Sequence, residues 1–173
     1  CPVGRKGSGL NKVSANDCRN CETGKYNDEP GTHPCKDCAT GKYNTNTQSV
    51  AESACLNCAT GQYAPVVGTT TCTKCEVGKF QGSTGQPTCD PCPIGRYTNS
   101  LGTVQCNLCQ AGRWQGSTGK TECVQCNAGR YNGNTGSTAV SACVPCSGSV
   151  CSGPGAASCG PAPAGKYTNS AKE

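Results

Sequence analysis

Aliphatic and aromatic side chains are scarce in this sequence. It has no Met, one Phe and one Trp. Leu, Ile, Val and Phe together make up about a tenth of the chain, well below the level at which a chain usually buries an ordinary core. Hydrophobic packing alone therefore does not explain a folded structure.

Long apolar runs and dense charge are also missing. No stretch of 18 apolar residues occurs, which excludes a membrane span within these residues. The 15 Lys and Arg residues face 10 Asp and Glu residues, a net charge of +5. Nucleic-acid-binding domains usually carry a denser basic surface. We expect neither a membrane span in this segment nor a nucleic-acid partner.

Catalytic groupings are absent as well. His33 is the only histidine, and the acidic residues are scattered singly except for Asp28 and Glu29. The sequence offers no paired carboxylates placed for acid and base chemistry, and no nucleophile with an orienting base. It has no C-x-x-C-H haem signature and no Gly-rich phosphate loop opening a helix. We expect no enzyme activity and no cofactor.

Cysteine, glycine and proline are abundant instead. The 19 Cys residues make up about 11% of the chain, a level typical of disulfide scaffolds. Disulfides persist in oxidising compartments, so this content indicates a secreted or cell-surface protein. The 24 Gly and 11 Pro residues disfavour long helices and continuous sheets. The expected fold is a small disulfide-rich one.

The cysteines form a tandem repeat. C-x-x-C occurs eight times, and the first cysteines of successive pairs follow one another in steps of 17 or 20. The pairs are Cys18/Cys21, Cys35/Cys38, Cys55/Cys58, Cys72/Cys75, Cys89/Cys92, Cys106/Cys109, Cys123/Cys126 and Cys143/Cys146. Such regular spacing predicts one structural unit repeated along the chain.

A Gly-basic-aromatic motif follows seven of the eight C-x-x-C pairs, and an eighth motif lies near the end of the chain, at residues 165–167. The aromatics of the motif are Tyr26, Tyr43, Tyr63, Phe80, Tyr97, Trp114, Tyr131 and Tyr167, which are all the aromatics of the chain. The preceding basic residues are Lys25, Lys42, Lys79, Arg96, Arg113, Arg130 and Lys166, with Gln62 as the exception. One structural role is therefore expected for all of these aromatics.

A turn closes each repeat. In the 17-residue repeats a Gly stands four places before the next Cys, as at Gly68 and Gly85, where a residue without Cβ can take a positive φ. Each repeat is predicted to be a short irregular β-hairpin, and the array an elongated, solenoid-like rod with little or no helix. The 20-residue repeats are expected to replace the Gly turn with a longer Ser/Ala segment.

The chain divides into two parts. Residues 1–146 are predicted to be the tandem 17-residue and 20-residue repeats, starting inside a repeat at Cys1, as in a piece of a longer protein. Residues 147–173 are predicted to be a divergent spacer rich in Gly, Ser, Pro and Ala, followed by the start of a degenerate repeat. There Cys151 is extra, and Ala162 stands where a cysteine would follow Cys159.

A disulfide framework is the favoured interpretation of the cysteines. Each bond would join the second Cys of one pair to the first Cys of the next, so that every loop of about 15 residues adds roughly 3 kcal/mol. The hypothesis pairs Cys1 with Cys18, Cys21 with Cys35, Cys38 with Cys55, Cys58 with Cys72, Cys75 with Cys89, Cys92 with Cys106, Cys109 with Cys123, Cys126 with Cys143 and Cys146 with Cys159. Cys151 is left over as a candidate for an inter-chain link.

Two alternatives for the cysteines stay open at this stage. The spacers between successive C-x-x-C knuckles fall near zinc-ribbon spacing, although a four-cysteine site should make alternate spacers differ. Thioredoxin-like redox motifs are the third interpretation, but they come singly near a βαβ pattern. We expect disulfides and no metal.

The motif side chains have two interpretations each. The aromatics would stack on cystines as a packing ladder, or they would form an exposed stripe for a sugar or a protein partner. Trp114 is the best single residue for such a stripe. The basic residues, one per repeat, would be solvated stems over neighbouring rings or would attract an acidic partner such as an acidic polysaccharide.

The unit C-x-x-C-x-x-G-K-Y, followed by a turn and another C-x-x-C as in residues 21–38 and 92–109, resembles the ephrin-receptor-like cysteine-rich repeat. It is also similar to the first module of tumour-necrosis-factor-receptor repeats. The resemblance covers residues 1–146 and implies an extracellular protein, the pairing of Cys21 with Cys35 and its equivalents, and tandem arrays like those of protist surface proteins. The crossed disulfides of the receptor pattern are missing, so cytokine binding is not implied.

These observations lead to one expectation and one alternative. We expect a structural extracellular protein, a stalk or building block of a surface coat, filament or appendage, with partners among copies of itself or other coat subunits. The alternative is a receptor ectodomain or adhesion module that binds a protein or glycan ligand.

Overall fold

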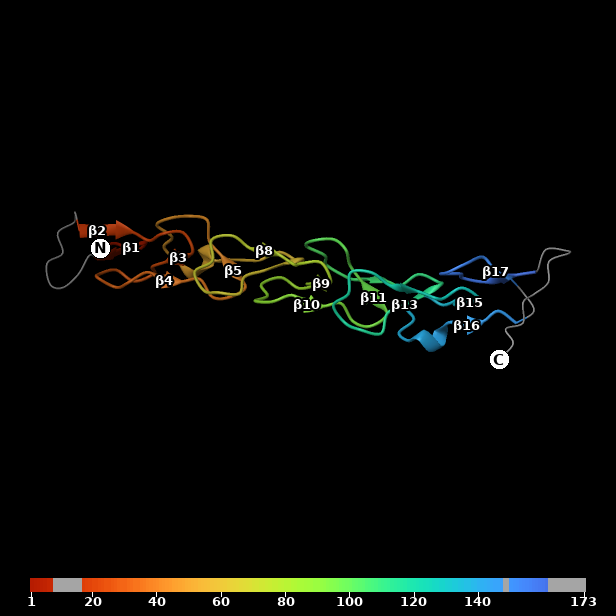
Figure 1. Cartoon of the computed structure of the whole chain (residues 1–173). Helices are drawn as coiled ribbons and strands as arrows, with labels where there is room; N and C mark the ends of the chain where they lie inside the picture. Colours follow the sequence, from red (N-terminus) through yellow and green to blue (C-terminus); the bar gives the residue numbers. More distant parts are fainter. Residues whose placement is uncertain (8–16, 148–149, 162–173) are drawn as a thin grey trace. The chain divides into compact units, whose positions relative to one another are not determined.

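The fold is a series of short hairpins. The computed structural model describes residues 1–7, 17–147 and 150–161, and in these residues it contains no α-helix and nine two-stranded sheets (Figure 1). The predicted fold class, a small disulfide-rich repeat of short antiparallel hairpins, is confirmed. The last predicted motif, Gly165 to Tyr167, and Ala162 lie outside the described residues.

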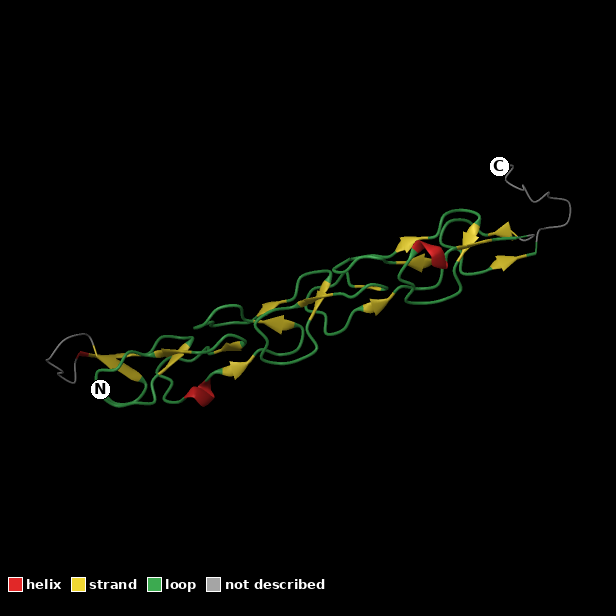
Figure 2. Ribbon diagram, turned by 90° about the horizontal axis from the view of Figure 1, so that it is seen from below, coloured by secondary structure: helices red, strands yellow, loops and turns green. Residues whose placement is uncertain are grey.

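Every strand is two or three residues long. The strands are β1 (Arg5–Gly7), β2 (Cys18–Asn20), β3 (Lys25–Tyr26), β4 (Lys36–Asp37), β5 (Lys42–Tyr43), β6 (Leu56–Asn57), β7 (Gln62–Tyr63), β8 (Thr73–Lys74), β9 (Lys79–Phe80), β10 (Asp90–Pro91), β11 (Arg96–Tyr97), β12 (Asn107–Leu108), β13 (Arg113–Trp114), β14 (Val124–Gln125), β15 (Arg130–Tyr131), β16 (Val144–Pro145), β17 (Val150–Cys151) and β18 (Cys159–Gly160). Two 3₁₀ turns, η2 (Glu52–Ala54) and η3 (Val140–Ala142), complete the elements. Loops and turns connect them (Figure 2).

The hairpins belong to two compact units. The first unit holds residues 1–76, 80–89 and 101–104, and the second holds residues 77–79, 90–100 and the chain from 105 onward. No helix in the part of the chain that the structure describes has the length and apolar composition of a membrane span.

Seven of the nine hairpins in the described residues pair the motif with the next C-x-x-C. The basic and aromatic residues form the first strand, and the two residues between the next two cysteines form the second. In β3 and β4, for example, Lys25 pairs with Asp37 and Tyr26 pairs with Lys36. The same register recurs in β11 with β12 and in β13 with β14. The repeat is named below by its motif glycine, so these residues belong to the Gly24 repeat.

The turn position is kept in every repeat whose turn the structure describes, including the 20-residue Gly41 and Gly129 repeats. Gly68, Gly85, Gly102 and Gly119 have φ between 68° and 70°, in the left-handed region. Gln48 and Gly136 take the same place in the two longer repeats, with φ of 57° and 68°. The expectation that these repeats replace the turn was wrong. Their three additional residues instead form η2 and η3 just before the cysteine.

Within each unit, backbone hydrogen bonds join one repeat to the next. The motif glycine N–H donates to a carbonyl of the following repeat, as from Gly61 to Gln81 at 2.7 Å and from Gly95 to Gln115 at 2.7 Å. The turn N–H reaches back, as from Gly119 to the carbonyl of Cys92 at 2.8 Å. Because both partners are backbone groups, these contacts depend little on side-chain identity.

The backbone of the repeat two places further along the chain also lies against the motif glycine. A Cβ on Gly24 would fall on the carbonyl oxygen of Gly68, and a Cβ on Gly78 would fall on that of Gly119. Both motif glycines have a positive φ, 78° and 79°. Glycine is therefore required here by close backbone approach as well as by conformation.

Cystines and polar side chains take the place of an apolar core. The second cysteine of most pairs is almost completely buried, and Cys21, Cys38, Cys58, Cys75, Cys92 and Cys109 are fully buried. Large aliphatic residues such as Leu56, Leu101 and Val140 are more than half exposed. The scarcity of apolar residues in the sequence is thus matched by a core that does not use them.

Candidate functional site

Eight disulfides staple the hairpins. Each joins the second cysteine of one pair to the first cysteine of the next and closes 14 or 17 residues. The bonds are Cys1–Cys18, Cys21–Cys35, Cys38–Cys55, Cys58–Cys72, Cys75–Cys89, Cys92–Cys106, Cys109–Cys123 and Cys126–Cys143. Loops of this size contribute about 3 kcal/mol each in the chain-entropy model, which offsets the missing apolar core.

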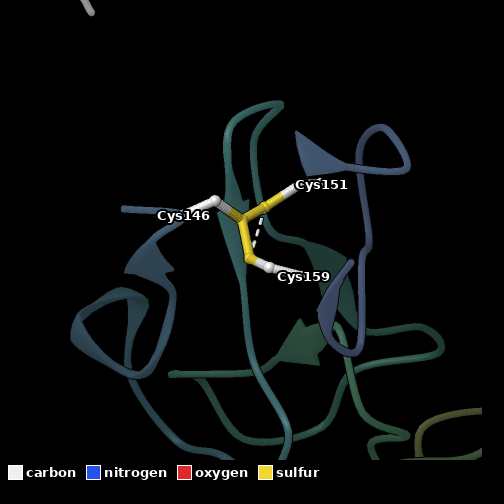
Figure 3. Close-up of side chains that lie close together, drawn as sticks. All are labelled: Cys146, Cys151 and Cys159. Carbon is white, nitrogen blue, oxygen red and sulfur yellow. Dashed lines mark hydrogen bonds between the residues drawn. A yellow bond between two sulfur atoms is a disulfide. The ribbon is translucent and has the colours of Figure 1, made fainter. Parts of the chain in front are cut away.

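Three cysteines meet after the last of these bonds. The sulfur of Cys146 lies within bonding distance of both Cys151 and Cys159, and the sulfurs of Cys151 and Cys159 are 2.9 Å apart (Figure 3). All three residues are half-buried. A sulfur atom forms one disulfide at a time, so this cluster, here called the cysteine trio, holds one disulfide and one further sulfur.

A buried position follows the aromatic in every described repeat from Gly24 to Gly129. The residues there are Asn27, Asn44, Ala64, Gln81, Thr98, Gln115 and Asn132, and each is at least 94% buried. We call this position the slot. In most repeats its side-chain oxygen accepts a hydrogen bond from the backbone N–H two residues later, as from Asn46 to Asn44 at 3.0 Å. The slot therefore starts the loop that leads to the turn.

The slot amide binds differently in Asn and Gln repeats. Asn44 Nδ2 donates to the carbonyl of Lys25 at 3.0 Å, and Asn132 Nδ2 donates to that of Arg113 at 3.0 Å, both in the preceding repeat. The longer Gln115 instead reaches the carbonyl of Glu122 at 2.8 Å in its own loop. Asn thus links two repeats, whereas Gln closes one.

Sequence reasoning missed the slot, although a signal was present. The residue after each motif aromatic is Asn, Gln or Thr in six of the seven repeats named above. A polar residue at one fixed repeat position, directly after an aromatic, is the pattern that would have found it. Polar residues between glycines are ordinarily assigned to exposed loops, which is why the pattern gives no burial signal by itself.

The motif aromatics lie on the first strand of each hairpin and are half-buried. This holds for Tyr26, Tyr43, Tyr63, Phe80, Tyr97, Trp114 and Tyr131. Neither fully packed nor fully exposed, these rings present one part to the hairpin and another to solvent. Tyr167 lies outside the described residues.

The basic residues of the motif bind groups of their own repeat. Arg96, Arg113 and Arg130 donate from Nη1 to the carbonyl of the next cysteine, at 2.9, 3.2 and 2.8 Å. Lys25 forms an ion pair with Asp37 at 2.7 Å, and Lys42 with Glu52 at 3.4 Å. Each guanidinium keeps further N–H donors in a planar fork, which suits a carboxylate or sulfate.

Two hollows in the second unit combine these residue types. One of about 420 Å³ is lined by Tyr97, Asn99, Gln110, Arg113, Thr121, Glu122 and Cys123. The other, of about 410 Å³, is lined by Trp114, Val124, Gln125, Asn127, Arg130, Val140, Ser141 and Cys143. Each places the aromatic of one repeat beside the arginine of the next. Their volumes fall within the range of small-molecule sites.

One exposed ion cluster lies in the Gly24 repeat. Lys36 Nζ is 2.8 Å from Asp28 and 2.6 Å from Glu29. Hydrogen bonding to Lys36 lowers the pKa of Asp28 and of Glu29, and the two carboxylates raise the pKa of Lys36. His33, the single histidine, lies 3.8 Å from Glu29 and is exposed. This cluster orders a loop and has no nucleophile.

The repeats match a known protein family. A family model described as tyrosine-protein kinase ephrin type A/B receptor-like matches residues 61–105 and 95–143. Residues 61–143 are ephrin-receptor-like repeats. No curated protein matches the chain. The hairpins and cystines before residue 61 follow the same spacing and register as the matched ephrin-receptor-like segment.

The family match shows what kind of module the repeats are. Ephrin-receptor-like repeats are non-enzymatic, cysteine-rich modules. Together with the extensive disulfides, the match indicates an extracellular module.

Proposed function

We propose that this protein is a structural component of an extracellular assembly, a stalk or building block of a surface coat, filament or appendage. The observation that carries the proposal is the uniform link between repeats. The same motif-glycine and turn hydrogen bonds recur within both units, and they involve backbone atoms alone. Such links stabilise an array whatever its surface residues are, as expected of a scaffold.

Self-association follows from the repeated surface. Exposed aliphatic residues lie between the cysteines of three consecutive pairs, at Leu108, Val124 and Val144, and also at Leu56. A neighbouring copy that binds one repeat meets an equivalent surface on the next. Many weak contacts of one kind then add up through avidity. Other coat or filament subunits with similar repeats would bind in the same way.

The second candidate is a receptor or adhesion module. It is favoured by the two hollows, where Tyr97 with Arg113 and Trp114 with Arg130 repeat one arrangement. An aromatic face beside a guanidinium fork suits a sugar ring that carries a carboxylate or sulfate. An acidic glycan that spans two repeats would contact both hollows at once.

Removal of the hollow arginines distinguishes the two candidates. The wild-type protein and the variant Arg113→Gln/Arg130→Gln are compared for self-association by sedimentation and for binding of heparin by calorimetry. If the protein is structural, the wild-type protein and the arginine variant should both self-associate as their concentration rises, and neither should bind heparin saturably. The control variant Lys74→Gln/Lys120→Gln removes two charges outside both hollows. The receptor candidate would be established if heparin binds the wild-type protein and the control variant saturably but does not bind Arg113→Gln/Arg130→Gln.

A further inference from the structure

The three sulfurs of the cysteine trio cannot all be in disulfides with one another at the same time. The chain has 19 cysteines, an odd number, and eight disulfides use 16 of them. Cys146, Cys151 and Cys159 remain, with their sulfurs all within 4.8 Å of one another. One disulfide among them therefore leaves one sulfur beside it.

The hairpin register explains why the third sulfur lies there. In β17 and β18, Val150 pairs with Gly160 and Cys151 pairs with Cys159. In the other hairpins the aromatic pairs with the residue after the first cysteine, as Tyr26 pairs with Lys36. Val150 thus takes the place of the aromatic, and Cys151 takes the slot. Because the slot residue lies opposite the stapling cysteine, a cysteine at that position directly faces the disulfide.

The hairpin of β17 and β18 is joined to the preceding repeats by the same backbone hydrogen bonds as the other hairpins. The turn residue Gly155 has a φ of 75° and donates from its N–H to the carbonyl of Cys126 at 2.8 Å. Asn132 N–H donates to the carbonyl of Ala156 at 3.0 Å. These are the turn and slot contacts of the earlier repeats. The strand that carries Cys159 is therefore anchored independently of which disulfide forms.

We propose that Cys146, Cys151 and Cys159 form a thiol–disulfide exchange site, in which one disulfide and one thiol interchange among three sulfurs. The Cys146–Cys159 bond continues the pattern of the array, with Cys151 as the thiol. The proposal goes beyond a structural or a binding role and applies to either. It gives the chain one exchange-labile staple in a series whose other described staples have no third sulfur nearby.

The exchange step balances without an oxidant. The Cys151 thiol loses its proton, and the thiolate attacks Sγ of Cys146. A Cys151–Cys146 bond forms, the Cys146–Cys159 bond breaks, and Cys159 leaves as a thiolate that takes up a proton. Attack on Sγ of Cys159 instead joins Cys151 to Cys159 and releases Cys146. Each step conserves one disulfide and one thiol, as in ordinary thiol–disulfide exchange.

Isolation of one pairing tests the proposal. The native full chain is quenched in acid, which stops exchange, and its disulfide isomers are separated at low pH and mapped as non-reduced peptides. One isomer is then returned to pH 8, and free thiols are blocked with N-ethylmaleimide at intervals. We expect the label to spread from one cysteine of the trio to at least one other. The rate should fall as the pH is lowered, because the thiolate and not the thiol attacks the disulfide.

Two variants serve as controls. Cys151→Ser should contain a single Cys146–Cys159 bond and no labelled thiol. Cys89→Ser frees Cys75 in an ordinary repeat, where the label should stay on Cys75 while the trio still exchanges. Because the wild-type chain is itself the main sample, the test does not depend on the folding of either variant.

Three results would overturn the proposal. One is a purified isomer that stays unchanged at pH 8, with a single labelled position. Another is a third sulfur held in a permanent inter-chain disulfide. The last is recovery of three thiolates with a bound metal ion, which would make the trio a metal site.

Discussion

The side chain of Asn44 donates a 3.0 Å hydrogen bond to the carbonyl oxygen of Lys25 in the preceding repeat. Asn44 is 99% buried, and it also binds Ser49 Oγ at 2.8 Å and the N–H of Asn46 at 3.0 Å. A small buried amide thus satisfies three polar groups in a protein that has almost no apolar core. The slot is a second stabilising element beside the cystine.

Loss of this amide should destabilise the array. Asn44→Ala leaves the carbonyl of Lys25 without its side-chain donor, and a buried group that loses its partner costs about 1–3 kcal/mol. Alanine fits the slot without strain, since Ala64 is fully buried in the equivalent position. We expect a free energy of unfolding lower by that amount, measured by chemical denaturation with the disulfides intact. An unchanged value would show that the slot amide is dispensable.

The exposed Asn127 provides the matched control. It lies on the surface, and its side chain has no hydrogen-bond partner in the described part of the chain. Asn127→Ala removes the same atoms and should change the free energy of unfolding by less than about 0.5 kcal/mol. Equal losses in the two variants would contradict the role assigned to the slot.

The two glycines of one close contact should respond differently to substitution. Gly78 and Gly119 both have a positive φ, 79° and 69°, so alanine at either costs about 1–2 kcal/mol of backbone strain. A Cβ on Gly78 would also strike the carbonyl oxygen of Gly119, whereas a Cβ on Gly119 meets Pro91 at an ordinary 3.5 Å. Gly78→Ala should therefore destabilise the protein clearly more than Gly119→Ala in thermal unfolding. Equal effects would mean that conformation alone selects glycine.

The ion cluster of the Gly24 repeat should titrate at unusually low pH. Lys36 lowers the pKa of Asp28 and Glu29 from their ordinary values of 3.8 and 4.5. Because these pKa values are depressed in the folded state, the stabilisation is complete above the ordinary values and is lost as the pH falls through the folded ones. It should be small, since the groups are exposed.

Carboxyl NMR titration measures this directly. Both midpoints should lie below the ordinary values in the wild-type chain and should rise in Lys36→Gln, while Lys74→Gln should leave them unchanged. Midpoints that do not move in Lys36→Gln would contradict the assigned ion pairs.

The staples and hairpins could be predicted because cysteine spacing reports geometry directly. Two cysteines 14 or 17 residues apart, with Gly-basic-aromatic between them, leave little choice beyond a small loop that folds back on itself. The same spacing placed the turns, except in the two longer repeats. There Gln48 adopts a positive φ that its residue type does not signal.

The contacts between repeats could not be predicted in the same way. They join backbone groups of successive repeats, such as those of Gly61 and Gln81, and backbone groups leave no trace in residue identity. The hairpin register was needed to find that Cys151 occupies the slot position. In the last hairpin, the residue that takes the place of the aromatic lies one residue closer to the preceding cysteine, Cys146, than the aromatics of the other repeats lie to theirs, so residue counting alone does not align it with them. The hollows beside Arg113 and Arg130 likewise depend on how one repeat follows the next.

Reduction of the native protein tests directly whether cystines take the place of an apolar core. Amide hydrogen exchange is followed on the full chain before and after treatment with a phosphine reductant under native conditions. We expect that protection of the motif glycine and slot amides, such as those of Gly61 and Gln81, is lost throughout both units once the disulfides are reduced. A reduced chain that keeps this protection would contradict it, because some other source of stability would then hold the repeats together.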